Sequence, residues 1–510
     1  MKNLLAFFIF FVCIISQVLA IAPVNYRLLC APGTVTAHSA TILWDKQSLG
    51  KDSASYEVLL GGKVISSTTK TNYTFAGLSP ATSYTVGVRI KQAGNITLKE
   101  ENILTFKTAP EGRVYNILDF GAKADSVSNN THAIQAAINA CTAGGTVYIP
   151  AGTFSSGALY LKSNMTLYIE KGGVLKGSTV VQDYLPMLLN RFEGWELNTY
   201  ASLLNAGTLN RNGTYNVKKL IIAGEGTISG GGKRLGDAMI KASGLRSRGR
   251  LICLMNCQDV SISGLTVTDP PCWTIHYIYS NNITCHDLNI ITKGIRNGDG
   301  IDPDSSTDCY IFNCTFDTGD DCIAIKSGKN PEGFFVRKPT RNVRITDCLF
   351  KKGHGISIGS EMSGGVSDVL VQDCKAGALL HGMQIKGTKE RGGYVKNVTV
   401  SNCELLQITV FSTVNYNNDG AAAPEVPIFT NFVFKDINLS KADIKQPVID
   451  INGFKDPGHQ LLNVSFTNVI LPENAVVHVT DSQQVKFTNV QSVSGIKPQY
   501  IINNSKEISK

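Results

Sequence analysis

The heptapeptide DCYIFNC, Asp308–Cys314, sets a pattern that recurs along most of the chain. Each copy has a polar start, apolar residues two positions apart, then Asp, Asn or Gly, and finally an apolar residue or Cys. The last positions of nine copies are separated by 21 to 34 residues: Leu265, Leu288, Cys314, Cys348, Cys374, Cys403, Ile437, Val469 and Val490. Alternation with a period of two predicts short strands, and its recurrence without intervening helices predicts a right-handed parallel β-helix. In such a solenoid each coil stacks on the last at about 4.8 Å.

The cysteines fit this solenoid better as small buried side chains than as disulfides. Twelve of them follow Cys13, an even number that favours disulfides in an exported protein. However, Cys314, Cys348, Cys374 and Cys403 share a column with Leu, Ile and Val. Stacked neighbours have parallel Cβ directions and a spacing wider than the roughly 3.5–4.5 Å of a disulfide. The Asp and Asn residues before them predict a ladder of turns.

The N-terminus has the features of a secretory signal peptide at residues 1–20. Lys2 precedes an apolar run, and the small residue Ala20 ends a typical cleavage site. No later stretch has the length of a membrane span, so we expect a secreted protein, extracellular or periplasmic, without membrane contact.

A separate module is expected at residues 21–110. Short alternating strands divided by Gly, Ser, Asn and Pro predict an antiparallel sandwich. Trp44 and the corner GLSPATSYTV, with Leu78 and Tyr84, resemble a fibronectin type III domain. The module has no cluster of titratable residues, which favours a spacer or a carbohydrate-adhesion role over catalysis.

Residues 111–510 are predicted to form the β-helix domain. One amphipathic helix, with Ile134, Ala137, Ile138 and Cys141 on a single face, is expected to cap its end. The net charge of +8, with a pI near 8.7, comes without a basic block. The net charge therefore excludes no functional class by itself, but it suits binding to a polyanionic polysaccharide better than binding to nucleic acid.

Titratable residues gather where the strands of the middle coils begin. Aligning DGIDPDS, DCIAIKS, HGISIGS and HGMQIKG places Asp299, Asp321, His354 and His381 in one column, with Asp320 beside Asp321. Neighbouring carboxylates cannot all ionise freely, so at least one should have a raised pKa while the others stay anionic. An acid and a base then coexist, as glycoside hydrolysis requires.

Two other interpretations of this cluster stay open. Asp302 and Asp304 add oxygens that suit a calcium site. The acids could also be a solvated turn, although His354 and Lys386 recur in register with them.

Four ordered motifs carry a family resemblance: NGDGIDPDS, TGDDCIAIKSG, GHGISIGSE and QIKG, preceded by YNILDFGAKADSVSNNTHAIQAAINAC. From about Val114 to beyond Tyr416 the chain resembles glycoside hydrolase family 28, the polygalacturonases, which have the pectin-lyase-like solenoid. The resemblance implies inversion by single displacement without a metal or cofactor.

The resemblance also implies roles for individual residues. Asp320 is expected to be the general acid, Asp299 and Asp321 to activate the water, His354 to support the charge state of the acid, and Lys386 to bind a substrate carboxylate. Tyr416, in VNYNND, matches a substrate-contacting tyrosine of the family.

The chain departs from the family pattern in two places. Gly298 stands where the family has Thr, next to Asn297, and Gln384 stands where it has Arg. A neutral amide cannot pair with a uronate carboxylate as Arg does, so Arg391 or Lys389 is expected to supply that charge. With Lys386 and Tyr416, we assign Asn297, Gln384 and Arg391 to substrate binding.

The segment RFEGWELNTYASLL from Arg191 resembles the exo-acting branch of the family. The leading hypothesis is therefore exo-acting hydrolysis of α-1,4-galacturonosidic bonds in polygalacturonate by a monomer. The alternatives are a galacturonidase on branched pectin, such as rhamnogalacturonan or substituted galacturonan, a pectin-binding solenoid without turnover, and a calcium-dependent lyase.

Overall fold

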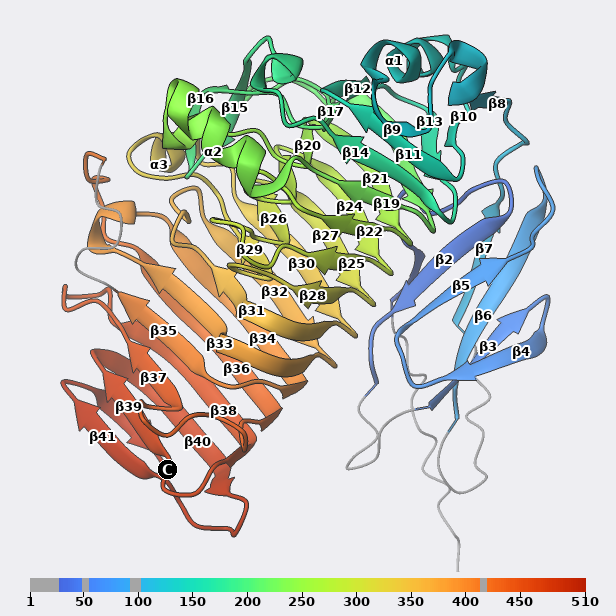
Figure 1. The fold of residues 1–510 in the computed structure, drawn as a ribbon. Helices are drawn as coiled ribbons and strands as arrows, with labels where there is room; N and C mark the ends of the chain where they lie inside the picture. Colours follow the sequence, from blue (N-terminus) through green and yellow to red (C-terminus); the bar gives the residue numbers. More distant parts are fainter. Residues whose placement is uncertain (1–26, 48–54, 92–101, 413–419) are drawn as a thin grey trace, which may run out of the picture. The chain divides into compact units, whose positions relative to one another are not determined.

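The structure is a computed structural model that describes residues 27–47, 55–91, 102–412 and 420–510 (Figure 1). The predicted signal peptide, at residues 1–20, lies outside these ranges. Within them, no helix has the length and apolar character needed to cross a membrane. The chain contains two compact units, and the larger one includes Lys107–Lys510.

The described N-terminal residues form two small sheets. Strands β3 and β4 pair antiparallel, as do β3 and β6. The rings of Trp44 and Tyr56, on β2 and β3, meet edge to face with centroids 5.4 Å apart, and both side chains are buried. This arrangement agrees with the predicted sandwich, while the fibronectin type III resemblance and the bounds 21–110 and 111–510 stay predictions. One sheet contains β1 (Leu28–Cys30), β2 (Ser39–Trp44) and β5 (Asn72–Ala76), and the other contains β4 (Lys63–Thr68), β3 (Ser55–Leu60), β6 (Ser83–Lys91) and β7 (Asn102–Lys107).

The repeat predicted from the sequence forms one long parallel sheet. Each copy of the heptapeptide pairs in register with the next, as Ile311 does with Ile345 and Cys403 with Ile437. Among the described residues this sheet has 14 strands, all parallel: β8 (Val114–Asn116), β10 (Gly145–Ile149), β13 (Met165–Ile169), β18 (Val217–Gly224), β21 (Cys257–Ser263), β24 (Asn281–His286), β27 (Thr307–Phe312), β30 (Thr340–Thr346), β32 (Val366–Gln372), β34 (Tyr394–Glu404), β36 (Ile428–Asn438), β38 (Leu461–Leu471), β40 (Ser482–Ser492) and β42 (Lys506–Ser509).

Two further parallel ladders complete the coils and merge in β31 (Leu349–Ile358). The first half of β31 pairs with β28, and its second half pairs with β29. The first ladder contains β9 (Asp125–Asn129), β11 (Gly152–Ser156), β14 (Gly173–Gly177), β19 (Thr227–Ser229), β22 (Thr266–Thr268), β25 (Asn289–Ile291) and β28 (Thr315–Asp317). The second contains β12 (Leu159–Leu161), β17 (Leu204–Ala206), β20 (Ile252–Met255), β23 (Ile275–Ile278), β26 (Ile301–Asp304) and β29 (Ile323–Ile325). After the merger the ladder continues through β33 (Lys375–Gly387), β35 (Ile408–Ser412), β37 (Ile449–Asn452), β39 (Val476–Thr480) and β41 (Gln499–Asn503).

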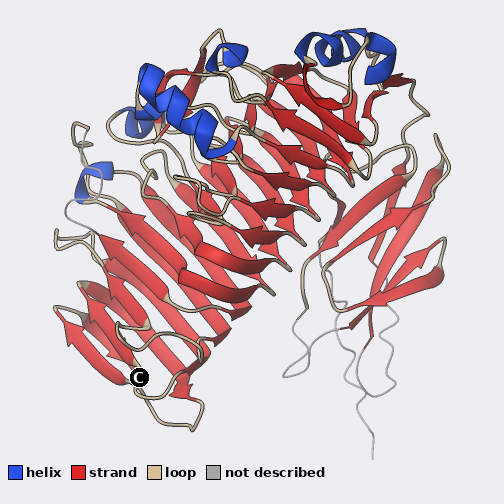
Figure 2. Cartoon of the chain, in the orientation of Figure 1, coloured by secondary structure: helices blue, strands red, loops and turns tan. Residues whose placement is uncertain are grey.

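This architecture confirms the predicted all-β fold, a right-handed parallel β-helix. Strands account for most of the larger unit, and its helices lie outside the coils (Figure 2). The apolar residues that alternate along the strands point into one continuous core between the ladders.

The cysteine column is confirmed as part of this core. All cysteines of the described residues are free thiols. The sulfurs of Cys314, Cys348, Cys374 and Cys403 each lie 3.2–3.4 Å from the backbone carbonyl two residues earlier, to which the thiol donates. These residues therefore act as small buried side chains with a satisfied donor.

The ladder of turns before these cysteines is also confirmed. Asn313, Asp347, Asp373 and Asn402 all have φ between 51° and 55°. Asn and Asp tolerate this left-handed conformation better than other residues with a side chain, because their short polar groups bond locally. Each of these four turns is thus encoded by a single Asn or Asp residue.

Three helices and a hairpin interrupt the coils in the part of the chain that the structure describes. The predicted capping helix is α1 (Thr131–Ala140), with Ile134, Ala137 and Ile138 buried. Helix α2 (Gly232–Ser243) was not predicted, because only Leu235 and Met239 mark its buried face among polar residues. The remaining elements are α3 (Glu332–Val336), the 3-10 turns η1 (Ile117–Phe120), η2 (Val181–Tyr184), η3 (Leu245–Ser247) and η4 (Lys389–Arg391), and the antiparallel hairpin of β15 (Leu188–Phe192) and β16 (Trp195–Thr199).

Candidate active site

The column of acids and histidines predicted from the sequence is present. Ile301 pairs with Ile323, Ile323 with Ile356, and Ile356 with Met383. Two residues before each of these positions the chain carries Asp299, Asp321, His354 and His381, which therefore lie on consecutive coils. The rings of the two histidines contact each other with centroids 5.8 Å apart.

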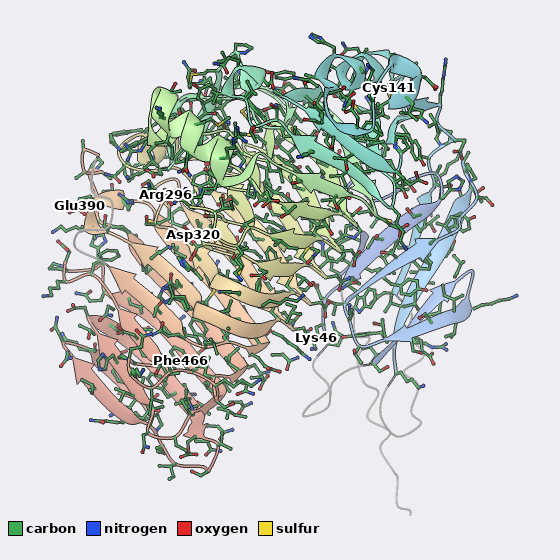
Figure 3. All side chains as sticks on the ribbon, in the orientation of Figure 1. Lys46, Cys141, Arg296, Asp320, Glu390 and Phe466 are labelled. Carbon is green, nitrogen blue, oxygen red and sulfur yellow. The ribbon has the colours of Figure 1, made fainter. Side chains whose placement is uncertain are left out.

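Asp320 and Asp321 occupy the bend between β28 and β29, on the middle coils (Figure 3). Oδ1 of Asp320 lies 2.9 Å from Nδ1 of His354, and Oδ1 of Asp321 lies 3.8 Å from the same nitrogen. Both carboxylates thus reach the same imidazole, although neighbours in a regular strand would point to opposite faces. The bend resolves this conflict, because both side chains can project to the same side there.

Two glycines shape the backbone that presents His354. Gly353 and Gly355 have φ of 130° and 97°, and the register between β31 and β33 shifts across them. Such values are accessible to glycine and strained for other residues. A Cβ at Gly353 would also lie 2.0 Å from the hydroxyl of Thr318. The GHG sequence therefore makes a bulge that directs the imidazole toward Asp320.

The pKa values of Asp320 and His354 are shifted in opposite directions. Burial raises the pKa of Asp320, but the hydrogen bond and charge of His354, with the charges of Lys386 and Lys326, outweigh burial and lower that pKa. The hydrogen bond to Asp320 in turn raises the pKa of His354, against the lowering effect of burial. In the substrate-free site the shared proton therefore favours the imidazole.

A raised pKa is found instead on a second pair of acids. Burial raises the pKa of Asp299 well above its usual range, and the neighbouring charges of Asp302 and Asp320 add to this while Lys326 opposes it. Burial likewise raises the pKa of Asp302 to about 7, against the charge of Lys326. The prediction that one carboxyl of the cluster has a raised pKa is confirmed, but for these two residues and not for the expected acid.

The outward face of β33 carries the expected lysine and its unusual neighbour. Nζ of Lys386 lies 3.4 Å from Oδ2 of Asp321. Gln384, buried and two residues earlier, pairs in register with Ser357, whose hydroxyl donates to Asp321 at 2.7 Å. Gln384 and Lys386 therefore lie on the same face beside the acids.

Asn297 and Arg391, two of the residues assigned to substrate binding, make hydrogen bonds within the protein. Oδ1 of Asn297 accepts a hydrogen bond from Arg248 at 2.7 Å. Arg391 is fully buried, and its guanidinium donates to the carbonyl of Ser360 at 2.9 Å and to Oδ1 of Asn330 at 2.6 Å. These contacts give Arg391 a supporting position, away from solvent. Tyr416 lies outside the described residues.

Gly298 has a steric explanation in the structure. A Cβ at this position would lie 2.9 Å from the carbonyl oxygen of Ile295 and 3.0 Å from that of Thr292. The Thr of the family pattern would not fit this backbone without a shift. Glycine at position 298 therefore allows the backbone to pack closely beside Asp299.

Asp320 and Asp321 lie close together. Asp320, Asp321 and His354 each place one potential ligand atom within 4.8 Å of the others. An inverting enzyme usually separates acid and base by about 6.5–9.5 Å. Asp320 and Asp321 have carboxylate oxygens closer than that, so room for a water is expected on the side of Asp299.

The proposed calcium ligands are already engaged by cations of the protein. Nζ of Lys326 lies 3.5 Å from Asp302, and Arg191 donates to Asp304 at 2.7 Å. Lys386 likewise accompanies Asp321. Carboxylates paired with ammonium and guanidinium groups are poor ligands for a divalent ion, so these residues do not fit a calcium site.

Several functional neighbours were missed by sequence analysis. Lys326 and Glu361 lie under the acids, with Nζ of Lys326 3.7 Å from Oε2 of Glu361. The quoted motifs contained the signal, because DCIAIKS and HGMQIKG place Lys326 in the column of Lys386. Arg191 was quoted only as the start of a loop, yet it is buried and anchors the β15–β16 hairpin to Asp304.

The whole chain is similar to several known proteins. The chain is 28% identical over 470 residues to the exo-poly-alpha-D-galacturonosidase of Dickeya chrysanthemi, covering 81% of this chain and 76% of that protein. It is 30% identical over 395 residues to an endo-polygalacturonase of Pectobacterium parmentieri, covering 72% of this chain and 89% of the relative. The structure of a family 28 exopolygalacturonase from Yersinia enterocolitica is similar with a TM-score of 0.85 and 26% identity, covering 96% of this chain and 99% of that one. Residues 142–496 match the family described as glycosyl hydrolases family 28, which is more than half of the chain, and the protein therefore belongs to this family of glycoside hydrolases.

Proposed function

We propose that the protein hydrolyses α-1,4-galacturonosidic bonds of polygalacturonate and acts from a chain end. The observation that carries this proposal is the contact of Asp320 with His354 beside Asp321 and Asp299, on a face that also presents Lys386. An acid, potential bases and a cation for a uronate are thereby within reach of one glycosidic bond.

In the proposed mechanism Asp320 protonates the oxygen of the leaving sugar while Asp299 and Asp321 take a proton from the attacking water. Asp320 needs a proton at that moment, and its lowered pKa means that it holds none for most of the time. His354 supplies it, because its Nδ1 lies 2.9 Å from Oδ1 of Asp320. Substrate binding expels water, and in a drier site a neutral Asp–His pair is favoured over an ion pair.

The exo-acting part of the proposal rests on similarity and on one added element. The relatives from Dickeya and Yersinia are named for exo-action. The β15–β16 hairpin, whose sequence resembled the exo-acting branch, is anchored beside β26 through Arg191 and Asp304. We place substrate contacts on Lys386 and Gln384, with Tyr416 as a further contact. A secreted monomer acting on pectic polysaccharide is the form that we propose.

A second candidate function is favoured by Gln384. A neutral amide beside Lys386 suits a neutral or substituted sugar better than a plain uronate. The protein would then act as a galacturonidase on branched pectin. Initial rates on linear polygalacturonate and on rhamnogalacturonan or substituted galacturonan, measured with the same enzyme stock, distinguish the two substrates.

The direct test is product analysis with the full-length protein. Exo-hydrolysis is supported if new reducing ends appear, short oligomers are released from the start of the reaction and the viscosity does not fall rapidly. An unsaturated product absorbing in the ultraviolet would indicate a lyase, and binding without products a non-catalytic solenoid. Asp320 and Asp321 are closer together than inversion usually requires, so the stereochemistry needs its own test. Proton NMR of the first product should show an inverted anomer, and a retained one would contradict single displacement.

A further inference from the structure

Lys326 is a buried cation surrounded by three carboxylates. Its Nζ lies 3.6 Å from Oδ2 of Asp299, 3.5 Å from Oδ1 of Asp302 and 3.7 Å from Oε2 of Glu361. The ammonium also lies 4.8 Å from the centre of the Trp273 ring, which adds a favourable cation–π contact. The side chain is only 5% exposed, so water screens these interactions little.

Lys326 is the largest favourable charge near the two acids Asp299 and Asp302, and Arg250 adds a smaller one at Asp302. Within the described residues, no amide, amine, guanidinium or hydroxyl group donates a hydrogen bond to Oδ1 of Asp299 or to either carboxylate oxygen of Asp302. A buried carboxylate without donors favours its protonated form. The charge of Lys326 is therefore the main contribution that opposes protonation of this pair.

We propose that Lys326 is a positioning residue that opposes the uptake of protons by Asp299 and Asp302, so that Asp299 can accept the proton of the hydrolytic water. Glu361 moderates this effect, because it shares the same ammonium. The inference rests on the proposed role of Asp299 as a base. It extends the site inward from Asp320 and Asp321 to the buried layer around Lys326.

The charges that face the pair come from every neighbouring element, and they agree with this assignment. Lys326 lowers the pKa of both Asp299 and Asp302 against the larger raising effect of burial, and it lowers the pKa of Glu361 in the same way. His276 of β23 pairs in register with Asp302. The remaining groups act on this layer through charge: Asp320 and Asp321 in the bend before β29, Arg250 before β20, Lys386 of β33 and Arg391 of η4.

Two substitutions with opposite expected signs test the proposal. Lys326→Met removes the cation, so the acid limb of the kcat/KM profile should move to higher pH, by about 1–3 units. Glu361→Gln removes a competing anion of nearly the same size, so the same limb should move to lower pH by a smaller amount. A purely structural role predicts a loss of activity in both variants without opposite shifts.

A matched control is provided by Lys329→Met. Lys329 is also fully buried and also lies over an indole, with Nζ 4.3 Å from the centre of the Trp195 ring, but Asp299, Asp302 and Glu361 are the ion-pair partners of Lys326. Its substitution should leave the acid limb in place whatever it does to the melting temperature. A shift of the limb in this variant equal to that of Lys326→Met would overturn the inference.

The remaining outcomes separate this inference from the proposed function. If Asp299→Asn keeps full turnover, the proposed role of Asp299 fails. If Asp299→Asn is inactive but the limb stays in place in Lys326→Met and Glu361→Gln, or moves in the same direction in both, the inference about Lys326 alone is wrong. If Lys326→Met does not fold, Glu361→Gln decides by itself, since a shift to lower pH supports the proposal and an unmoved limb overturns it.

Discussion

Nδ1 of His354 lies 2.9 Å from Oδ1 of Asp320, and the backbone N–H of His354 donates to the carbonyl of Asp320 at the same distance. The two residues are thus joined at both side chain and backbone across neighbouring coils. The double contact fixes the imidazole against the carboxyl that we propose as the acid. Because the two residues share one proton, the titration of the pair belongs to both of them together.

Asp320→Asn should keep the fold and substrate binding but lower kcat by about two to four powers of ten, because the amide has no transferable proton. Reducing-sugar assays give kcat, and calorimetric titration with an oligogalacturonide gives affinity. Turnover near that of the wild type would reassign the acid.

The same substitution should change the titration of His354. Its pKa is raised chiefly by the hydrogen bond to Asp320, so Asp320→Asn should lower that pKa. The imidazole would then lose its proton at a lower pH than in the wild type. NMR titration of labelled histidines measures the change, and an unchanged His354 would show that the pair does not share a proton. His381→Gln is the control for general disturbance of the histidine pair.

Lys386→Ala should cost far more transition-state stabilisation than Gln384→Ala, on the order of 2–5 kcal/mol, if it leaves a substrate carboxylate buried without its cation. Lys386 is also paired with Asp321, so the variant should lower kcat as well as raise KM. Steady-state kinetics on polygalacturonate measure both. Equal effects of the two alanines would remove this strand from the substrate site.

Adding a charge at position 384 discriminates between substrates. Gln384→Arg should lower KM for polygalacturonate if a plain uronate binds there. On branched pectin it should depress activity if a neutral or substituted sugar is bound instead. Because Gln384 is buried, the melting temperature of the variant serves as the control for misfolding.

Gly298→Thr should destabilise the protein by about 1–3 kcal/mol, because the added atoms overlap the carbonyls of Ile295 and Thr292. Gly298→Ala introduces only the Cβ and should cost less. Thermal unfolding measures both. A Thr variant as stable as the wild type would show that this bend adjusts freely.

The hairpin of β15 and β16 should depend on its buried ion pairs. Arg191→Met removes the guanidinium that lies 2.7 Å from Asp304 and 3.4 Å from Glu196, and should cost about 3–5 kcal/mol. Adding Asp304→Asn should recover part of that loss, since the two residues share one contact. Denaturant unfolding of the single and double variants tests this, and strictly additive losses would contradict it.

The coils, the turn ladder, the cysteine column and the row of acids could all be predicted from the sequence. All four follow from local rules, because strands alternate with a period of two and only a few residues adopt left-handed turns. Register then brings Asp299, Asp321 and His354 onto neighbouring coils without further information.

Only the tertiary structure decided which cation meets which acid. Lys326 and Lys386 share a column in the sequence, yet one lies under Asp299 and the other beside Asp321. Arg391, predicted to face the substrate, points inward to Asn330. A long side chain can reach across coils to a buried charge or carbonyl that would otherwise lack a partner. Which partner it reaches depends on packing between distant segments.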